Sequence, residues 1–206
     1  MRTAAFVIAV ALLFTGCARV YVPPAIDLKP HEVVGIIKFS SNSKGDLTDY
    51  VTQKFIESIT EDQEELRVAE LGNEKAVLAA IDQADLGPDA LKAIGEKYKV
   101  ASVFIGDLTV SDVKPSCIAG PGFASFEAKV SAKLAVKLVE TATGITLWTN
   151  SGRDERTVAG VSRFGSDLSF DAEDPDEAYG DLARELCRRV THDFRHTRRS
   201  KCCCHR

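Results

Sequence analysis

The sequence lacks several features that identify common enzymes and channels. It contains neither a G-x-S-x-G nucleophile motif nor a GxxxxGK[ST] phosphate loop, and we find no internal repeat. Its only long apolar run is at the amino terminus, so no further transmembrane helix is expected. A net charge of −4 does not favour nucleic-acid binding. What remains after that first run, about 190 residues, suits a single domain.

Residues 1–16 have the pattern of a signal peptide. Arg2 supplies a positive charge, and residues 4–14 form an apolar run that is too short to span a bilayer. Small residues then precede Cys17, as in a bacterial lipobox, although Phe14 stands where Leu is usual. The alternatives are an ordinary secreted protein that is cleaved nearby and an uncleaved membrane anchor.

The lipobox predicts that Cys17 becomes the first residue of the mature protein. Its thiol would then carry diacylglycerol, and acyl chains such as palmitate would anchor the protein stably. Ala18 follows instead of the Asp that retains lipoproteins in the inner membrane of enteric bacteria. We therefore expect a lipid-anchored protein of the outer membrane that faces the periplasm.

The rest of the chain divides into three predicted parts. Residues 17–31 hold the lipidated cysteine and a short tether with three prolines. Residues 32–196 are predicted to form an α/β domain. Residues 197–206 are a basic, cysteine-rich tail, in contrast to the acidic remainder of the chain.

Apolar periodicity predicts the elements of the domain. Its clearest example is a period-two alternation over residues 126–140, which a turn at Gly144 links to a returning strand. The predicted strands are 32–39, 66–71, 100–110 and a hairpin over 126–152, and the predicted helices are 46–60, 73–84, 88–98 and 174–195. Residues 111–126 and 159–173 are expected to be loops. This order predicts an α/β fold with a single mixed sheet, parallel and antiparallel, flanked by helices.

Several of these segments resemble the CsgG/LpoB group of envelope lipoproteins, whose domain is similar to the amino-terminal domain of TolB. The resemblance lies in VVGIIKF, KYKVASVFIGDL and AVKLVETATGITLWT. Its most specific parts are Ile105-Gly106-Asp107 and the hairpin from Thr143-Gly144 to Leu147-Trp148. The resemblance implies a periplasm-facing, protein-binding domain without a cofactor.

Two departures bear on the best-known roles of that group. Its secretion channel carries two additional long hairpins, whereas residues 111–126 contain two prolines without alternation and residues 149–171 are charged. A subunit of a secretion channel is therefore kept only as an alternative. The tether is also short for an activator that must cross the cell wall to reach a penicillin-binding protein.

The function that we predict is a non-enzymatic, protein-binding module in envelope assembly or secretion. Its partner would be another envelope protein or a second copy of the chain, with no small-molecule substrate, nucleic acid or cofactor. The expected contacts lie in the segments 111–126 and 153–173 and beside the only tryptophan. The residues named for this role are Phe123, Trp148, Arg153 and Arg156.

A second alternative is a metal-handling lipoprotein. Two imidazoles four residues apart would share one face of the last helix, and thiolates and imidazoles suit Zn²⁺ or Cu⁺. The candidate ligands are His192, His196, Cys202, Cys203, Cys204 and His205. The competing interpretation is a solvated basic helix end.

Lipidation of Cys17 would leave five cysteines, an odd number. A bridge between Cys117 and Cys187, tail bridges to another chain, and a plain buried role for Cys187 all remain open.

Other polar segments carry no specific prediction. The segment SSNSKGD, residues 40–46, is expected to be a loop and helix cap instead of a phosphate cradle. The loop carboxylates fix no acid–base pair, and a solvated acidic surface is the default. They are Asp107, Asp112, Asp154, Glu155, Asp171 and Glu173.

Overall fold

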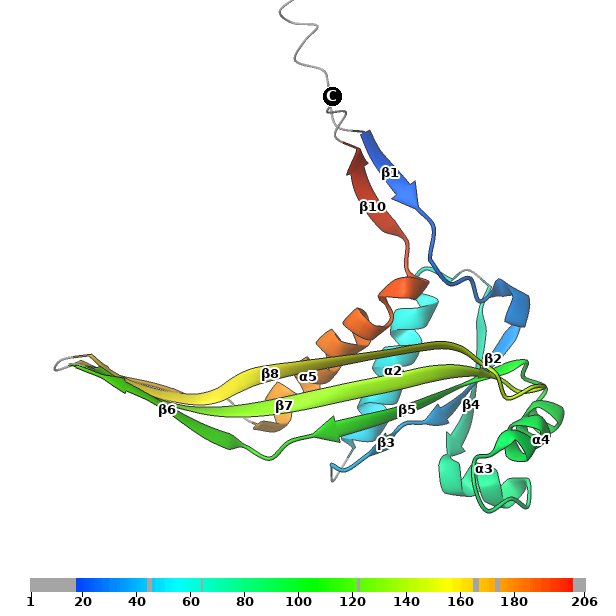
Figure 1. Ribbon diagram of the computed structural model, residues 1–206, viewed down its shortest axis with the longest axis horizontal. Coiled ribbons are helices and arrows are strands. Elements are labelled where there is room, and N and C mark those ends of the chain that lie inside the picture. The colour runs from blue at the N-terminus through cyan, green and yellow to red at the C-terminus, as the bar shows by residue number, and fades with distance from the viewer. Residues whose placement is uncertain are drawn as a thin grey trace, which may run out of the picture.

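The computed structural model describes residues 18–43, 46–63, 65–121, 123–164, 167–172 and 175–201. Its main feature is an eight-stranded sheet in which the strands along the main path follow the order β4-β2-β5-β7-β8-β9 (Figure 1). Two further strands, β3 and β6, pair with β5 and β7. The strands are β2 (Val33–Lys38), β3 (Ser40–Ser41), β4 (Arg67–Asn73), β5 (Ser102–Val110), β6 (Lys114–Gly120), β7 (Phe123–Glu140), β8 (Thr146–Phe164) and β9 (Asp167–Ala172).

The sheet is mixed, as the order of elements predicts. Strand β2 pairs in parallel with both β4 and β5. From β5 onward, β7, β8 and β9 are antiparallel neighbours. The α/β fold with one mixed sheet flanked by helices is therefore confirmed.

Four helices among the described residues flank this sheet: α2 (Leu47–Thr60), α3 (Glu74–Ala80), α4 (Pro88–Tyr98) and α5 (Pro175–Val190). Helices α2 and α5 contact each other, and α5 lies against β7 and β8. The alternating residues Val130, Leu134 and Leu138 are buried in the core that these two helices share with the sheet. Each such side chain stabilises the fold by about 2 kcal/mol through burial alone.

Aromatic rings join distant parts of this core. Phe55 on α2 packs edge-on against Phe104 on β5, with ring centroids 5.1 Å apart. Phe104 contacts Phe194 in the short 3₁₀ helix η3 (His192–Phe194) at 5.7 Å, and Phe194 contacts Trp148 on β8 at 4.7 Å. The chain end after α5 is thus part of the core.

Helices α3 and α4 belong to a second, smaller apolar cluster, which includes Val77, Ile94 and Val103. Asn73 caps α3, because its Oδ1 accepts a hydrogen bond from the Ala76 amide at 2.8 Å. The helix ends at Ala80, earlier than the predicted residue 84, and α4 begins at Pro88, where the predicted helix begins.

The largest departure from the sequence prediction concerns the two segments expected to be loops. Residues 114–120 form β6, while residues 159–164 and 167–172 belong to β8 and β9. Strands β7 and β8 have 18 and 19 residues, which at about 3.3 Å per residue span roughly 60 Å. They carry the sheet well past the helices (Figure 1).

The predicted tether and tail also contain strands. Strand β1 (Ala18–Val22) pairs antiparallel with β10 (Thr197–Lys201), and the two form a separate ribbon that leaves the body of the domain (Figure 1). Leu28, just before the 3₁₀ helix η2 (Lys29–His31), is fully buried, so the folded part begins before residue 32.

Candidate functional site

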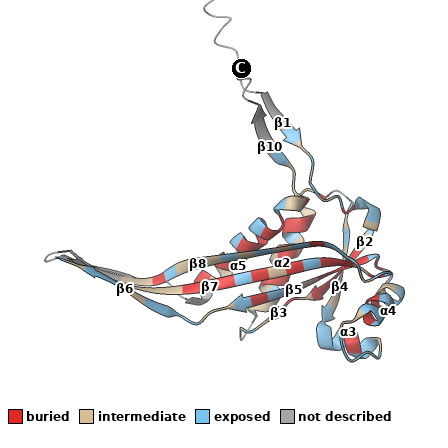
Figure 2. Ribbon diagram, in the orientation of Figure 1, coloured by how far each residue is buried: buried red, intermediate tan, exposed pale blue. Residues whose placement is uncertain are grey.

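The outer part of the sheet is here called the β-extension: residues 114–120, 123–129, 159–164 and 167–172. Along β7, even-numbered residues from Val130 to Leu138 face the core. Phe126 continues the same alternation, yet it is 58% exposed. Figure 2 shows burial along the middle of β7 and exposure toward its outer end. The apolar face of the sheet therefore extends beyond the helices that cover it.

Further apolar groups are exposed nearby. Cys117 on β6 stands opposite Phe126 in the strand register, and both are exposed. Ile118, which is 56% exposed, lies on the opposite face of the sheet, because its register partner is Ser125. Among the described strands β6 pairs with β7 alone, which leaves its other edge open. An open edge with apolar side chains is a surface that other proteins bind.

The four predicted partner-binding residues lie in different surroundings. Trp148 is 8% exposed, and its Nε1–H donates to Oδ2 of Asp193 at 3.0 Å, so its side chain offers little surface to a partner. Arg153 is exposed on β8, opposite Lys133 and outside the β-extension. Arg156 forms an ion pair with Asp181 at 2.6 Å. Phe123 begins β7 and pairs through its backbone with Phe164 near the outer end.

A cleft of about 880 Å³ lies where α5 begins, between the loop after β3, the start of α2 and the end of β5. Its volume falls within the range of ligand sites. Its polar lining includes four carboxylates: Asp46, Asp112, Glu177 and Asp181. The polar contacts of α5 in the cleft join that helix to neighbouring elements.

Those contacts centre on Asp181 and Tyr50. Arg156 and Arg184 both pair with Asp181, Arg184 at 3.0 Å. Arg184 also donates from Nε and Nη2 to the Tyr50 hydroxyl at 3.3 and 3.2 Å, and this bond, more than Asp181, raises the pKa of its guanidinium. The network ties α5 to α2 and β8, which is a structural role.

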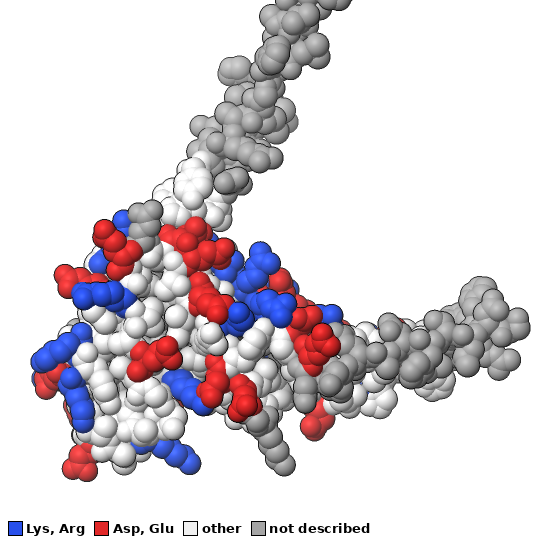
Figure 3. All heavy atoms as spheres, turned by 180° about the vertical axis from the view of Figure 1, so that it is seen from behind, with Lys and Arg blue, Asp and Glu red and all other residues white. Residues whose placement is uncertain are grey.

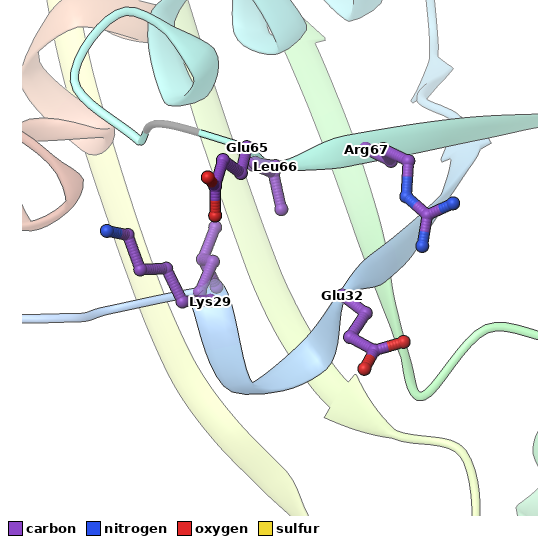
Figure 4. A pocket seen from close by; sticks show the side chains of 6 residues that line it. Lys29, Glu32, Glu65, Leu66 and Arg67 are labelled. Atoms are coloured by element: carbon purple, nitrogen blue, oxygen red, sulfur yellow. The ribbon is translucent and has the colours of Figure 1, made fainter.

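A smaller hollow of about 260 Å³ lies between the segment before β2 and the start of β4 (Figure 4). Lys29 and Arg67 bring positive charge to it, and Glu32 and Glu65 bring negative charge. Its volume is below the usual range of ligand pockets, and its charges are mixed. On the face opposite to that of Figure 1, acidic and basic side chains of the described residues are likewise interspersed (Figure 3).

The geometry predicted for a metal site is wrong. Helix α5 ends at Val190, and Arg195 has an extended backbone, so His192 and His196 do not share one face of a helix. Nε2 of His192 lies 3.0 Å from Oδ1 of Asp193, and Nδ1 of His196 lies 3.6 Å from Oδ1 of Asp62. Within the described residues no group of three or more His, Cys, Asp and Glu side chains gathers. The other candidates, Cys202, Cys203, Cys204 and His205, lie outside the described residues.

The two described cysteines are both free, so the bridge between Cys117 and Cys187 is wrong. Cys187 is fully buried on α5, 3.6 Å from the carbonyl oxygen of Val51, which confirms its interpretation as a buried residue. Burial raises the pKa of the Cys187 thiol to about 12.

This burial predicts a large difference in thiol reactivity. At pH 8 a pKa of about 12 in place of about 9 lowers the thiolate population of Cys187 roughly a thousandfold. In the folded protein iodoacetamide should therefore alkylate Cys117 and leave Cys187 unmodified, as peptide mass spectrometry would report. In urea both should react. Equal alkylation rates in the folded protein would contradict the buried position.

The predicted contact segment 111–126 contains Ile118 and Phe126, but the sequence prediction named neither of them as an exposed apolar residue of the site. For Phe126 the sequence held a signal, because this residue begins the period-two run of apolar residues over 126–140. For Ile118 there was none, since strand β6 shows no alternation.

No helix in the described part of the chain is long and apolar enough to cross a membrane. No protein-family model and no curated protein matches the sequence.

Solved structures with a similar course include the PelC dodecamer from Paraburkholderia phytofirmans, at 12% identity and a TM-score of 0.43 over 86% of this chain and 96% of that one. The carboxy-terminal domain of LpoB from Escherichia coli is 11% identical, with a TM-score of 0.38 over 59% of this chain and 81% of that domain. The lipoprotein GNA1162 from Neisseria meningitidis is 15% identical, with a TM-score of 0.36 over 61% and 83%. At these identities and scores the resemblances assign the chain to no family and no function.

Proposed function

We propose that this chain is a lipoprotein of the outer membrane, anchored through Cys17 and facing the periplasm, that acts as a non-enzymatic protein-binding module in envelope assembly or secretion. Its partner is another envelope protein or a second copy of the chain. The observation that carries the proposal is the β-extension, which has an apolar face without a covering helix among the described residues and an open strand edge.

Burial energetics explain why this surface favours a protein partner. Covering a side chain such as Phe126 contributes about 2 kcal/mol, and backbone pairing along β6 adds hydrogen bonds that define a register. The β-extension is a four-stranded ribbon that offers a partner its faces and the edge of β6. The binding surface therefore fits an extended segment or sheet edge of another protein.

The position of the anchor is compatible with this role. Strand β1 begins at Ala18, directly after Cys17, and Ile26 already packs against the core. A lipid on Cys17 would keep the domain close to the membrane. The β-extension would then sample partners in a thin layer beside that membrane.

Photo-crosslinking in intact cells tests the protein-binding surface. A benzoylphenylalanine at Phe126 or Ile118 should give covalent adducts, and one at Ile145 should not. Ile145 is a matched control, because it is 60% exposed but lies at the other end of the β7–β8 hairpin. Mass spectrometry identifies the adduct as a second copy or another envelope protein, and both outcomes support the proposal. Adducts of equal yield at all three positions, or at none, would contradict it.

The anchor is tested separately. Mature protein from membranes should begin at Cys17 and carry the mass of its acyl chains, and Cys17→Ser should abolish this modification and release the protein from the membrane fraction. An unmodified Cys17 in the wild-type protein would refute the anchor while leaving the crosslinking result intact.

A second candidate, the secretion-channel subunit, gains support from one observation. The segments 111–126 and 149–171, whose sequence argued against long hairpins, lie largely in β6, β7, β8 and β9. A channel subunit would form rings of defined size when the lipidated protein is purified in detergent. Electron microscopy of that preparation would reveal them, whereas single copies would remove this candidate.

A further inference from the structure

The ribbon of β1 and β10 brings the two ends of the chain together. Five pairs of residues are in register, and the last pair joins Ala18 to Lys201. Because Ala18 is bonded to Cys17, the carboxy-terminal strand ends beside the residue that follows the proposed anchor. Figure 1 shows this end of the ribbon pointing away from the domain.

The base of the ribbon is held firmly on the domain. The amide of Ile26 donates to the carbonyl oxygen of Asp193 at 3.0 Å. Tyr21 stacks on His196 with ring centroids 4.6 Å apart, and the amide of His196 donates to Oδ2 of Asp62 at 3.0 Å. The two hydrogen bonds join the segment after β1 to η3 and the residue before β10 to the turn after α2, so both strands of the ribbon are attached at its base.

The charge of the ribbon is entirely positive. Its two strands contain Arg19, Arg198, Arg199 and Lys201 and no acidic residue. Residues 195–206 also contain no Asp or Glu, although the chain as a whole has a net charge of −4. The ribbon is thus a basic segment of an acidic chain, and its first strand begins directly after Cys17.

We propose that the β1–β10 ribbon binds the anionic headgroups of the leaflet in which Cys17 is anchored; the choice of that membrane rests on the proposed function. A five-residue strand spans about 17 Å, and Arg19, Arg199 and Lys201 lie within two residues of its anchored end. At that distance along the strands, their backbone positions lie within about one Debye length, 8 Å, of a charged surface placed at the anchored end. Basic residues next to a lipid anchor add electrostatic attraction to anionic headgroups.

The ribbon would also set the position of the binding surface. The β-extension leaves the body in a different direction from the ribbon (Figure 1). Contact between the ribbon and the headgroups would therefore leave Ile118 and Phe126 accessible to a partner.

Vesicle flotation tests the proposal with the unlipidated mature chain, residues 17–206 with Cys17→Ser. Vesicles of phosphatidylcholine mixed with phosphatidylglycerol should bind it at low salt, and vesicles of phosphatidylcholine alone should not. The triple variant Arg198→Glu, Arg199→Glu and Lys201→Glu should bind at least about a hundredfold more weakly. Each cation near an anionic surface contributes about 1 kcal/mol to binding.

The matched control reverses three exposed cations of the domain body: Lys92→Glu, Lys133→Glu and Lys137→Glu. It changes the net charge equally and should keep its binding. Equal losses in both variants, or no binding by the parent chain, would overturn the proposal. Should the ribbon variant melt at a lower temperature than its parent, the triple Gln variant at the same positions replaces it and must bind more weakly than a control with Gln at its own three positions.

Failure of the ribbon to bind lipid is distinct from failure of the proposed function. The flotation assay uses a chain without a lipid, so it tests the ribbon alone. The mass of the mature protein tests lipidation of Cys17 and does not depend on the ribbon. A lipidated protein whose ribbon ignores anionic vesicles would refute only the headgroup contact.

Discussion

Replacing Gln63 by Leu is expected to lower the free energy of unfolding by about 3–5 kcal/mol, because three backbone groups, two of them in buried hydrogen bonds, lose their partner. Gln63 is 5% exposed. Its Oε1 accepts from the amide of Leu28 at 3.0 Å, and its Nε2 donates to the carbonyl oxygens of Ile26 at 3.0 Å and Phe194 at 2.8 Å. One amide thus joins the entry of the chain, its exit and the end of α2.

Urea unfolding followed by circular dichroism measures this loss. Gln53→Leu is the matched control, because Gln53 is an exposed residue on the helix that Gln63 follows, and it should change the stability by less than about 0.5 kcal/mol. Limited proteolysis should also cut Gln63→Leu faster near residues 23–31, where the freed backbone loses its attachment. Similar unfolding midpoints for the two variants would refute the role of Gln63.

Most elements of the central domain could be predicted, because their own side chains determine them. The alternation from Val130 to Leu138 places every second residue in the core, so the strand follows from the sequence alone. Asn73 and Pro88 mark helix starts through local chemistry that requires no distant partner. Where the local sequence and the burial pattern agree, the expected element is present.

The β-extension could not be predicted in this way. Both faces of β6 are largely exposed, so no burial pattern selects alternating residues. Pro115 argued for a loop, but proline is tolerated on an edge strand, where one side of the backbone has no partner. Strand β6 exists because β7 pairs with it, and nothing in the sequence of β6 itself indicates that pairing.

The ribbon illustrates the same limit over a greater distance. Strands β1 and β10 lie near opposite ends of the sequence, and prolines follow the first of them. No local pattern indicates that Ala18 and Lys201 are partners. Gln63 was also overlooked, since a glutamine just after a helix gives no sign that three distant backbone groups surround it.

The motifs that carried the family resemblance have structural explanations here. Trp148 fills the core, and Gly144 takes a positive φ of 73° in the turn of the hairpin. Asp107 accepts hydrogen bonds from Ser40 at 2.8 Å and Thr109 at 3.0 Å, which fixes β3 against β5. These residues hold the sheet, while the binding surface that we propose lies in its outer part.

Gly106→Ala is expected to destabilise the protein by about 1–3 kcal/mol through overpacking. A Cβ atom at this position would lie 2.7 Å from two ring carbons of Phe39. Phe39 cannot move away easily, since it is 2% exposed, packs on Phe55 with centroids 5.0 Å apart and donates its amide to Oγ1 of Thr52 at 3.1 Å. The glycine of the Ile105-Gly106-Asp107 motif thus makes room for an aromatic ring.

In the matched control, the same substitution at another glycine is expected to raise the stability. Gly180 lies inside α5, where a Cβ atom would meet no described heavy atom within 4 Å beyond the helix's own backbone, so Gly180→Ala should stabilise the protein by about 0.5–1 kcal/mol. Combining Gly106→Ala with Phe39→Leu should cost less than the sum of the two single changes, because the smaller side chain removes the clash. Additive losses in this double-mutant cycle, measured by urea unfolding, would show that the ring is not what excludes a side chain at residue 106.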